Sequence, residues 1–231
     1  MNVIETKIEG LLILEPRVFG DDRGWFMESF NKKAFEQILK ERNLPIPQFV
    51  QDNHSYSQKN TLRGLHFQKA PYAQGKLVRV VQGKAWDVAV DIRPESKTYG
   101  QWVGVELSGE NSKQFWIPEG FAHGFVALED NTQFLYKTTN YYNKDSEGAI
   151  IWNDPTLDID WSIDDLDKIL VSDKDQKARS FLELSCRDVF FISSRNRVIL
   201  GHPAGTLYKR LPCPTYTSPV IHPSSIRMTC C

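Results

Sequence analysis

The pattern of hydrophobic and polar positions follows the two-residue period of a strand over most of the chain. From residue 76 to 140, short apolar runs recur at intervals of roughly ten residues, with Gly, Asn or Asp at most of the joints. The predicted strands of this region are residues 76–83, 84–93, 101–108, 113–120, 122–130 and 132–142. Many short strands at this spacing are typical of an antiparallel sandwich or barrel. The sequence therefore predicts a mainly β fold.

The segments on either side of this region add further strands and a polar end. Residues 11–19 and 25–30 are apolar runs that flank the turn sequence GDDRG at 20–24, and residues 49–57 resume an extended pattern. Residues 165–184 are more polar and predict a loop with a short helix. A small β barrel built from such strands encloses a cavity of a size that suits one small ligand.

One segment has the period of a helix. The sequence NKKAFEQILKERN predicts a helix over residues 31–43, with Asn31 as its N-cap. Phe35, Ile38 and Leu39 share one face of this helix and are its candidate core contacts.

The predicted strand TLRGLHFQ, residues 61–68, carries two ionisable side chains among apolar ones. Residues i and i+2 share a face, so an unbroken strand would place Arg63 and His66 on opposite faces. Gly64 lies between them and permits a bulge or a bend that re-aims one of the two. The alternative is an edge strand, with Arg63 in solvent and His66 hydrogen-bonded in the core.

Composition and charge exclude some classes of function. The 231 residues are 41% hydrophobic, 25% charged and 12% aromatic, which suits a globular protein with one sizeable core and an extension. A net charge of −1 gives no electrostatic case for nucleic acid or an anionic membrane as a partner. The sequence has no run of eighteen apolar residues and no basic segment before an apolar core. We therefore expect neither a membrane helix nor a signal peptide, and a cytoplasmic location.

The end of the chain differs from the rest. Residues 186–231 hold 6 basic residues but only 1 acidic residue, all 4 cysteines, 5 of the 12 prolines and no tryptophan, without a helical or strand period. We predict a body over residues 1–185 and an appended extension over 186–231 that is disordered or wrongly translated, as after a frameshift. A basic accessory tail is the alternative, and DVFFISSRNRVILG could form one hairpin. A cysteine-free body needs neither disulfides nor a thiolate metal site.

Polar side chains that can do acid–base chemistry are scattered through the body. The candidates are Arg23, Glu28, the polar run 51–55, Arg63, His66, Lys76, His123, Tyr136, Asp173 and Asp175. Each alone is more often a solvated or capping side chain. Together they supply a general base, a carboxylate to orient it, an oxyanion stabiliser, a proton donor and an anion clamp. The sequence has neither a nucleophile elbow nor a Gly-rich phosphate loop.

Six segments of the body closely resemble the dTDP-4-dehydrorhamnose 3,5-epimerase family. They are DDRGWFMESF, FVQDNHSYSQKNTLRGLHFQ, QGKLVRVVQGKAWDVAVDIR, WIPEGFAHGF, FLYKTTNYY and LVSDKD, in order through nearly all of residues 1–185. The tail from Cys186 lies outside the family pattern. The resemblance implies a cupin-type jelly roll with a few short helices, a homodimer, a dTDP-sugar substrate, and no metal or organic cofactor.

The resemblance also implies the reaction. It is the conversion of dTDP-4-dehydro-6-deoxy-D-glucose to dTDP-4-dehydro-L-rhamnose, by removal and return of protons at C3 and C5. The product would serve dTDP-rhamnose biosynthesis, for example for the O antigen of lipopolysaccharide.

Residue roles follow from the same resemblance. His66 resembles the catalytic base and Asp175 its carboxylate partner. Tyr136 matches the acid, and Lys76 the lysine near the keto oxygen of the sugar. The implied substrate-binding residues are Arg23, Glu28, Gln51, Asp52, Asn53, Arg63, His123, Glu147, Lys174 and Tyr142, with Tyr141 as a further candidate for stacking on thymine.

Three other functions stay open. An enzyme of the same family could invert only C3 or only C5. A metal-dependent cupin is a second alternative, because PEGFAH matches half of the cupin pattern and His54, His66 and His123 could supply three ligands. GLHFQ, however, lacks the H-x-H continuation of that pattern. The third alternative is a non-catalytic protein that binds sugar nucleotides and keeps only the fold.

Overall fold

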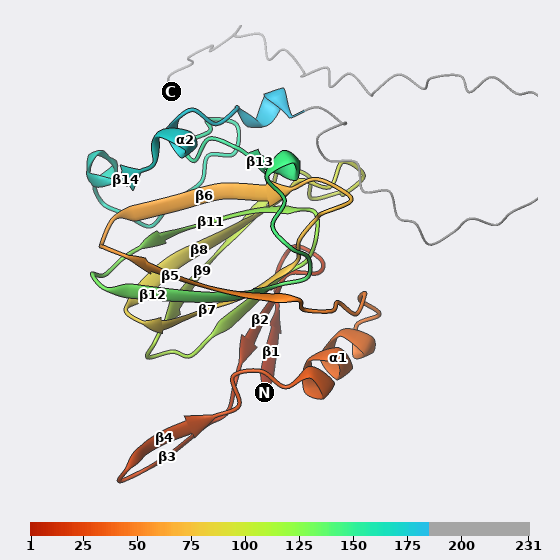
Figure 1. Cartoon of the computed structure of the whole chain (residues 1–231), viewed down its shortest axis with the longest axis vertical. Helices are drawn as coiled ribbons and strands as arrows, with labels where there is room; N and C mark the ends of the chain where they lie inside the picture. The colour runs from red at the N-terminus through yellow and green to blue at the C-terminus, as the bar shows by residue number, and fades with distance from the viewer. Residues whose placement is uncertain (185–231) are drawn as a thin grey trace, which may run out of the picture. The chain divides into compact units, whose positions relative to one another are not determined.

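The computed structural model describes residues 1–184, and most of their strands form two facing sheets (Figure 1). In order across the first sheet, the strands are β1 (Asn2–Glu5), β2 (Leu12–Glu15), β10 (Gln114–Ile117), β7 (Lys76–Gln82), β12 (Thr132–Thr138) and β5 (Gln51–Ser57). The second sheet consists of β13 (Glu147–Ala149), β6 (Thr61–Gln68), β11 (Phe121–Ala127), β8 (Lys84–Asp91) and β9 (Trp102–Ser108), and β14 (Leu170–Val171) also pairs with β6.

The remaining elements are short and lie outside these two sheets. β3 (Val18–Asp21) and β4 (Gly24–Met27) form a two-stranded hairpin that projects from the body (Figure 1). The helices are α1 (Lys32–Glu41) and α2 (Asp173–Gln176). The 3-10 turns are η1 (Lys144–Ser146), η2 (Leu166–Lys168) and η3 (Phe181–Glu183). The predicted mainly β jelly roll with a few short helices is therefore confirmed.

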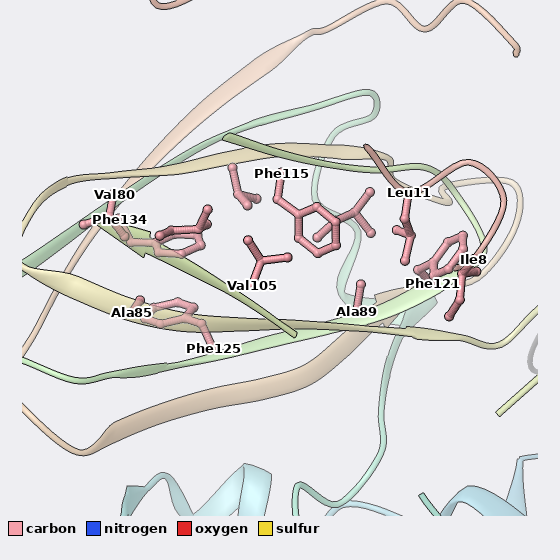
Figure 2. Packing of buried hydrophobic residues seen from close by; sticks show 13 residues of the cluster. Ile8, Leu11, Val80, Ala85, Ala89, Val105, Phe115, Phe121, Phe125 and Phe134 are labelled. Atoms are coloured by element: carbon pink, nitrogen blue, oxygen red, sulfur yellow. The ribbon is translucent and has the colours of Figure 1, made fainter. Parts of the chain in front are cut away.

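An apolar core fills the space between the two sheets (Figure 2). Strand alternation builds it, because Ala89 of β8 faces this core whereas Val88 faces the other side of the second sheet. Phe125 and Phe134, one from each sheet, stack at 4.1 Å between ring centroids. Tyr136 packs against this cluster, so the core supports a side chain that was singled out for its chemistry.

The C-terminal part of the body covers the outer face of the second sheet. Ile150, Leu157, Trp161 and Phe181 are buried there, in one cluster with Leu65 and other residues of β6, β8 and β11. This packing holds the segment that leads to α2 against the sheet. It also explains why residues 165–184, which are more polar in sequence, have a defined place in the fold.

The predicted helix forms with the cap and the buried face that the sequence indicated. The side chain of Asn31 accepts a hydrogen bond from the backbone N–H of Ala34 at 3.1 Å. Phe35, Ile38 and Leu39 are buried against the outer face of the first sheet. Both predictions for this helix are confirmed.

Some element boundaries differ from the prediction. The predicted strand 11–19 is two strands, β2 and β3, with Pro16 in the break between them, because proline lacks the N–H that a ladder needs.

No helix among the described residues is long and apolar enough to cross a membrane. The predicted extension over 186–231 lies outside the described residues, so its boundary and its disorder stay predictions.

Candidate active site

The bulge that Gly64 permits is present in β6. His66 pairs with His123 of β11 and Arg63 pairs with Phe125, so three steps of β6 match two steps of β11. The extra residue turns Arg63 and His66 to the same side, and both line one cavity. Gly64 has a φ of +137°, and a Cβ there would lie 2.9 Å from the carbonyl oxygen of His123. Only glycine fits this position without a shift of the backbone.

A cleft between the two sheets consists of two lobes that meet at His66, Lys76 and Tyr136. The first lobe has a volume of about 370 Å³ and the second of about 380 Å³. The first is also lined by Ser55, Arg63, His123, Ser172, Lys174 and Asp175. The second is also lined by Gln51, Asn53, Gln68, Gln74, Tyr142 and Glu147. A cleft with this many converging polar groups suits an elongated polar ligand that occupies both lobes.

His66 and Asp175 form a dyad in the first lobe. Nε2 of His66 lies 2.6 Å from Oδ1 of Asp175, whose side chain is almost fully buried. Burial by itself would raise the pKa of Asp175, but the hydrogen bond and charge of His66, with the N–H of Gly64, hold that pKa below its usual value. When His66 is neutral, the ionised Asp175 can accept the Nε2 proton, which leaves Nδ1 of His66 with a free lone pair. The dyad has the form of an oriented general base.

Two elements bring Asp175 to His66. β14 pairs in parallel with the start of β6, and α2 follows β14 directly. Ser172 caps α2 by accepting a hydrogen bond from the backbone N–H of Asp175 at 3.2 Å. The cap fixes the start of the helix, so the carboxylate of Asp175 points at the bulge in β6.

Lys76 and His123 form a second polar group, together with a carboxylate behind them. Nε2 of His123 lies 2.8 Å from Oδ2 of Asp87, and Nδ1 of His123 lies 3.5 Å from Nζ of Lys76. Burial lowers the pKa of Lys76 to about 8, against the charges of Asp87 and Glu147, which raise it. Burial and the charge of Lys76 lower the pKa of His123 against the pull of Asp87. A neutral His123 thus donates to Asp87 and turns its lone pair toward the ammonium of Lys76.

Tyr136 faces the dyad from the other sheet. It belongs to β12 of the first sheet, whereas His66 belongs to β6 of the second, and both line both lobes. Burial raises the pKa of Tyr136, and the nearby charge of Arg63 lowers it by less. The phenol therefore keeps its proton at neutral pH and can donate it from the side opposite His66.

The second lobe ends at a small charged network. Nζ of Lys174 in α2 lies 2.5 Å from Oε1 of Glu147, and the hydroxyl of Tyr142 donates to Oε2 of Glu147 at 3.2 Å. Burial would raise the pKa of Glu147, but its bonds to Lys174 and Tyr142 lower it further than burial raises it. Glu147 therefore stays ionised and joins the segment around Tyr142 to α2, the helix that carries Asp175.

The structure brings most of the implied site residues to this cleft. The lining residues include His66, Lys76, Tyr136, Asp175, Arg63, His123, Gln51, Asn53, Glu147, Lys174 and Tyr142. Three implied binding residues lie elsewhere, and Tyr141, the further candidate for stacking, lines neither lobe. Arg23 lies in the β3–β4 hairpin and pairs with Asp21 at 2.6 Å, and Glu28 accepts from the side chain of Asn31. Asp52 binds Lys137 at 2.9 Å beside a smaller hollow.

Two buried residues of the site were not singled out from the sequence. Asp87 is completely buried behind His123, and its position inside the apolar run KAWDVAVDIR was a signal that could have marked it. Gln68 lines the second lobe and is also buried. Its neutral side chain at the end of an apolar strand gave no comparable signal.

The three histidines proposed as metal ligands do not converge. His66 and His123 line the cleft, but His54 is exposed on β5 and bonds Gln133 at 3.1 Å. Over residues 1–184, no three His, Cys, Asp or Glu side chains lie close enough together to hold a metal ion. The geometry therefore gives no support to the metal-dependent cupin alternative.

The comparison with protein families decides which group the chain belongs to. The family model described as dTDP-4-dehydrorhamnose 3,5-epimerase matches residues 5–183. The chain belongs to the dTDP-4-dehydrorhamnose 3,5-epimerase family. An Escherichia coli member named dTDP-4-dehydrorhamnose 3,5-epimerase is 58% identical over 184 residues, which are 80% of this chain and 96% of the relative.

Solved structures of the epimerase family have the same fold. A dTDP-6-deoxy-D-glucose-3,5-epimerase from Legionella pneumophila, solved in complex with dTDP-4-keto-L-rhamnose, is 49% identical with a TM-score of 0.76. The match covers 81% of this chain and 96% of that one. A 3'-monoepimerase from Streptomyces bikiniensis, in complex with dTDP-quinovose, is 30% identical with a TM-score of 0.70, over 76% of this chain and 85% of that one.

Proposed function

We propose that the protein epimerises the 4-keto sugar of dTDP-4-dehydro-6-deoxy-D-glucose at C3 and C5 and yields dTDP-4-dehydro-L-rhamnose. The arrangement of acid and base supports this most strongly. The His66–Asp175 dyad lines the cleft from one sheet, and Tyr136 lines it from the other. Inversion of a carbon needs a proton acceptor on one face and a proton donor on the other.

The chemistry uses the acidity of hydrogens next to a ketone. His66 removes a proton from the carbon next to the C4 carbonyl, and Asp175 stabilises the imidazolium that forms. The electron pair of the broken C–H bond moves to the C4 oxygen, where Lys76 stabilises the enolate. One well-placed donor of this kind contributes about 3 kcal/mol. Tyr136 then returns a proton to the opposite face.

Different residues would bind the diphosphate, the sugar and the base of the substrate. Arg63 and a second guanidinium would bind the diphosphate, because this group accepts bidentate hydrogen bonds from arginine. Gln51, Asn53, Glu147 and Lys174 hydrogen-bond the nucleotide sugar. Tyr142 is 57% exposed at the second lobe, which suits stacking on the base.

A product assay tests the function. The protein is incubated with dTDP-4-dehydro-6-deoxy-D-glucose, and the sugar is identified by its ring-proton couplings in NMR. We expect the couplings of the L-rhamno configuration, with inversion at both C3 and C5. Unchanged couplings over long incubation with bound substrate would overturn the proposed function.

A mono-epimerase is the second candidate function. It is favoured by one observation, the structural match to a protein that is named a 3'-monoepimerase. The same NMR spectrum separates the candidates, because inversion at C3 alone changes a different set of couplings from inversion at both carbons.

We also propose a homodimer in which the β3–β4 hairpin contacts the second copy. Phe19, Trp25 and Phe26 of this hairpin are 51%, 64% and 67% exposed, which is costly for a surface that stays in water. A second copy that covers these rings would bring Arg23 to the cleft of its partner. Arg23 would then be the second guanidinium for the diphosphate.

The setting of the reaction completes the proposal. We propose catalysis without a metal or an organic cofactor, in the cytoplasm, within dTDP-rhamnose biosynthesis and thus toward surface glycans such as O antigen. Retention of full activity after dialysis against EDTA is the expected result. A loss that added metal restores would contradict the cofactor-free reaction.

A further inference from the structure

One buried amide holds both sides of the segment that carries Tyr142. Nε2 of Gln68 donates to the carbonyl oxygens of Tyr72 at 2.6 Å and Tyr141 at 3.1 Å. Oε1 of Gln68 accepts from the backbone N–H of Asn143 at 2.7 Å. Both donor hydrogens and the acceptor oxygen of this side chain are thus in use. Two of the three bonds go to the residues immediately before and after Tyr142.

Gln68 is well suited to such a task because its side chain is largely buried. It is the last residue of β6, it is only 6% exposed, and it pairs with Glu147 across the ladder to β13. Hydrogen bonds are stronger in buried surroundings than at the surface, and breaking one there leaves a polar group unsatisfied. The backbone at Tyr141 and Asn143 is therefore fixed from inside the protein.

Tyr142 has weaker support of its own. Its ring is largely in solvent, and its hydroxyl bond to Glu147 is exposed. An exposed hydrogen bond of this kind contributes little to the order of a side chain. The position of the ring at the rim of the second lobe therefore depends on the backbone that Gln68 holds.

We propose that Gln68 is a positioning residue for nucleotide binding, which acts by holding the backbone of Tyr142 so that the ring is ready to stack. The inference rests on the proposed function, because it takes the ligand of the second lobe to be a deoxythymidine nucleotide. A ring that is ordered before binding loses less conformational freedom when the base stacks on it. Removal of the amide should therefore weaken binding and leave the proton transfers at His66 unchanged.

The test is a double-mutant cycle with dTDP as the probe, measured by calorimetry on the full chain. Gln68→Met removes all three hydrogen bonds and keeps the side-chain length. We expect the Kd of dTDP to rise about tenfold in Gln68→Met and by a similar factor in Tyr142→Ala. The double variant should bind no more weakly than Tyr142→Ala alone, because Gln68 acts through that ring. The kcat of Gln68→Met should stay within about twofold of the wild type, while its KM rises.

Two controls accompany the cycle. Gln58→Met changes an exposed amide that lines neither lobe and should leave the Kd unchanged. Arg63→Lys alters the first lobe, and its effect should add to that of Gln68→Met. If Gln68→Met does not fold, Gln68→Glu takes its place, because it keeps the acceptor for Asn143 and loses both donors.

The outcomes separate the inference from the function. Additive effects of Gln68→Met and Tyr142→Ala on the Kd would overturn the inference. A fall in kcat at unchanged KM would overturn it as well, because the amide would then serve the chemistry. Wild-type protein that neither binds dTDP nor converts the dTDP-sugar would overturn the proposed function itself.

Discussion

At the scale of single residues, the site depends on charges that the protein holds in defined states. Asp175 stays ionised because its bonds to His66 and Gly64 outweigh the effect of burial on its pKa. Lys76 is much closer to losing its charge, because burial brings its pKa down to about 8. Replacement of Asp175 and replacement of Lys76 should therefore affect activity in different ways.

Replacement of Asp175 should remove most of the activity but leave substrate binding nearly unchanged. In Asp175→Asn the amide cannot stabilise an imidazolium, so we expect kcat to fall by about 10²–10⁴-fold, the usual share of a general base. KM should change by less than about threefold, because the variant keeps the size of the side chain. Steady-state kinetics with the dTDP-sugar checks this. A variant with near-wild-type kcat would remove Asp175 from the mechanism.

Lys76 should set the alkaline limit of the reaction. The charged ammonium stabilises the enolate, so activity is present below the pKa of Lys76 and is lost as the pH rises through about 8. In Lys76→Arg the cation stays charged, and the loss near pH 8 should disappear even if kcat is lower. A profile of kcat/KM against pH from 6 to 10 for both proteins gives the answer, because this ratio reports the ionisation of the free enzyme. An identical alkaline limb in the variant would assign that limb to another group.

At the scale of secondary-structure elements, the bulge in β6 is the feature that assembles the site. It turns Arg63 and His66 to one side, and it brings the N–H of Gly64 to within 3.4 Å of Asp175. The pairing of β14 with β6 then places α2 beside the bulge.

A side chain at the bulge should damage both stability and activity. In Gly64→Ala the Cβ would collide with Gly124 in β11, and the backbone at φ +137° is strained for alanine. We expect a loss of about 2 kcal/mol or more in the free energy of unfolding. Urea denaturation measures this loss, with Gly20→Ala in the hairpin as the control, because that site has room for a Cβ. Equal stabilities of the two variants would contradict the account of the bulge.

The sequence predicted parts of these elements well and others not at all. The helix with its Asn31 cap follows from local rules, and Gly64 marked where a bend could form, so both could be read from single segments. The partners Asp175 and Asp87 could not be paired with their histidines in this way. The distance in sequence from His66 to Asp175 is 109 residues, and only the packing of the C-terminal part brings them together. Without the family resemblance, the residues alone left two placements of Arg63 and His66 open. Either a bend re-aims one of them, or Arg63 lies in solvent and His66 in the core.

At the scale of the whole molecule, two features reach beyond the cleft of one chain. The β3–β4 hairpin exposes aromatic rings and carries Arg23, 90% of whose side chain is exposed. The family match ends at residue 183, so the tail lies outside the part that the family shares. Each feature leads to a prediction.

Subunits with different defects should complement each other if Arg23 serves the partner's cleft. Arg23→Ala and His66→Ala homodimers are each expected to be nearly inactive. After the two proteins are unfolded and refolded together, half of the dimers contain one intact site, and activity should recover to about a quarter of the wild type. Mixing without refolding is the control. No recovery, with mixed dimers shown by mass spectrometry, would mean that Arg23 does not act across the dimer.

The tail should be dispensable. Truncation after Ser185 removes residues that lie outside the family match, so we expect kcat and KM to stay unchanged or activity to rise. Kinetics and light scattering on the shortened chain check this. A large loss of activity would show that the tail has a role in the enzyme.

The measurement that tests the central claim most directly is the uptake of solvent deuterium. The protein is incubated in D2O with dTDP-4-dehydro-6-deoxy-D-glucose, and the C3 and C5 proton signals are followed by NMR in the wild type, His66→Ala and Tyr136→Phe. We predict that the wild type loses both signals and that His66→Ala loses neither, although it binds dTDP. Tyr136→Phe should still exchange protons while completed inversion is impaired, most clearly at C5. Exchange at both carbons in His66→Ala, at the rate of the wild type, would contradict the assignment of the base.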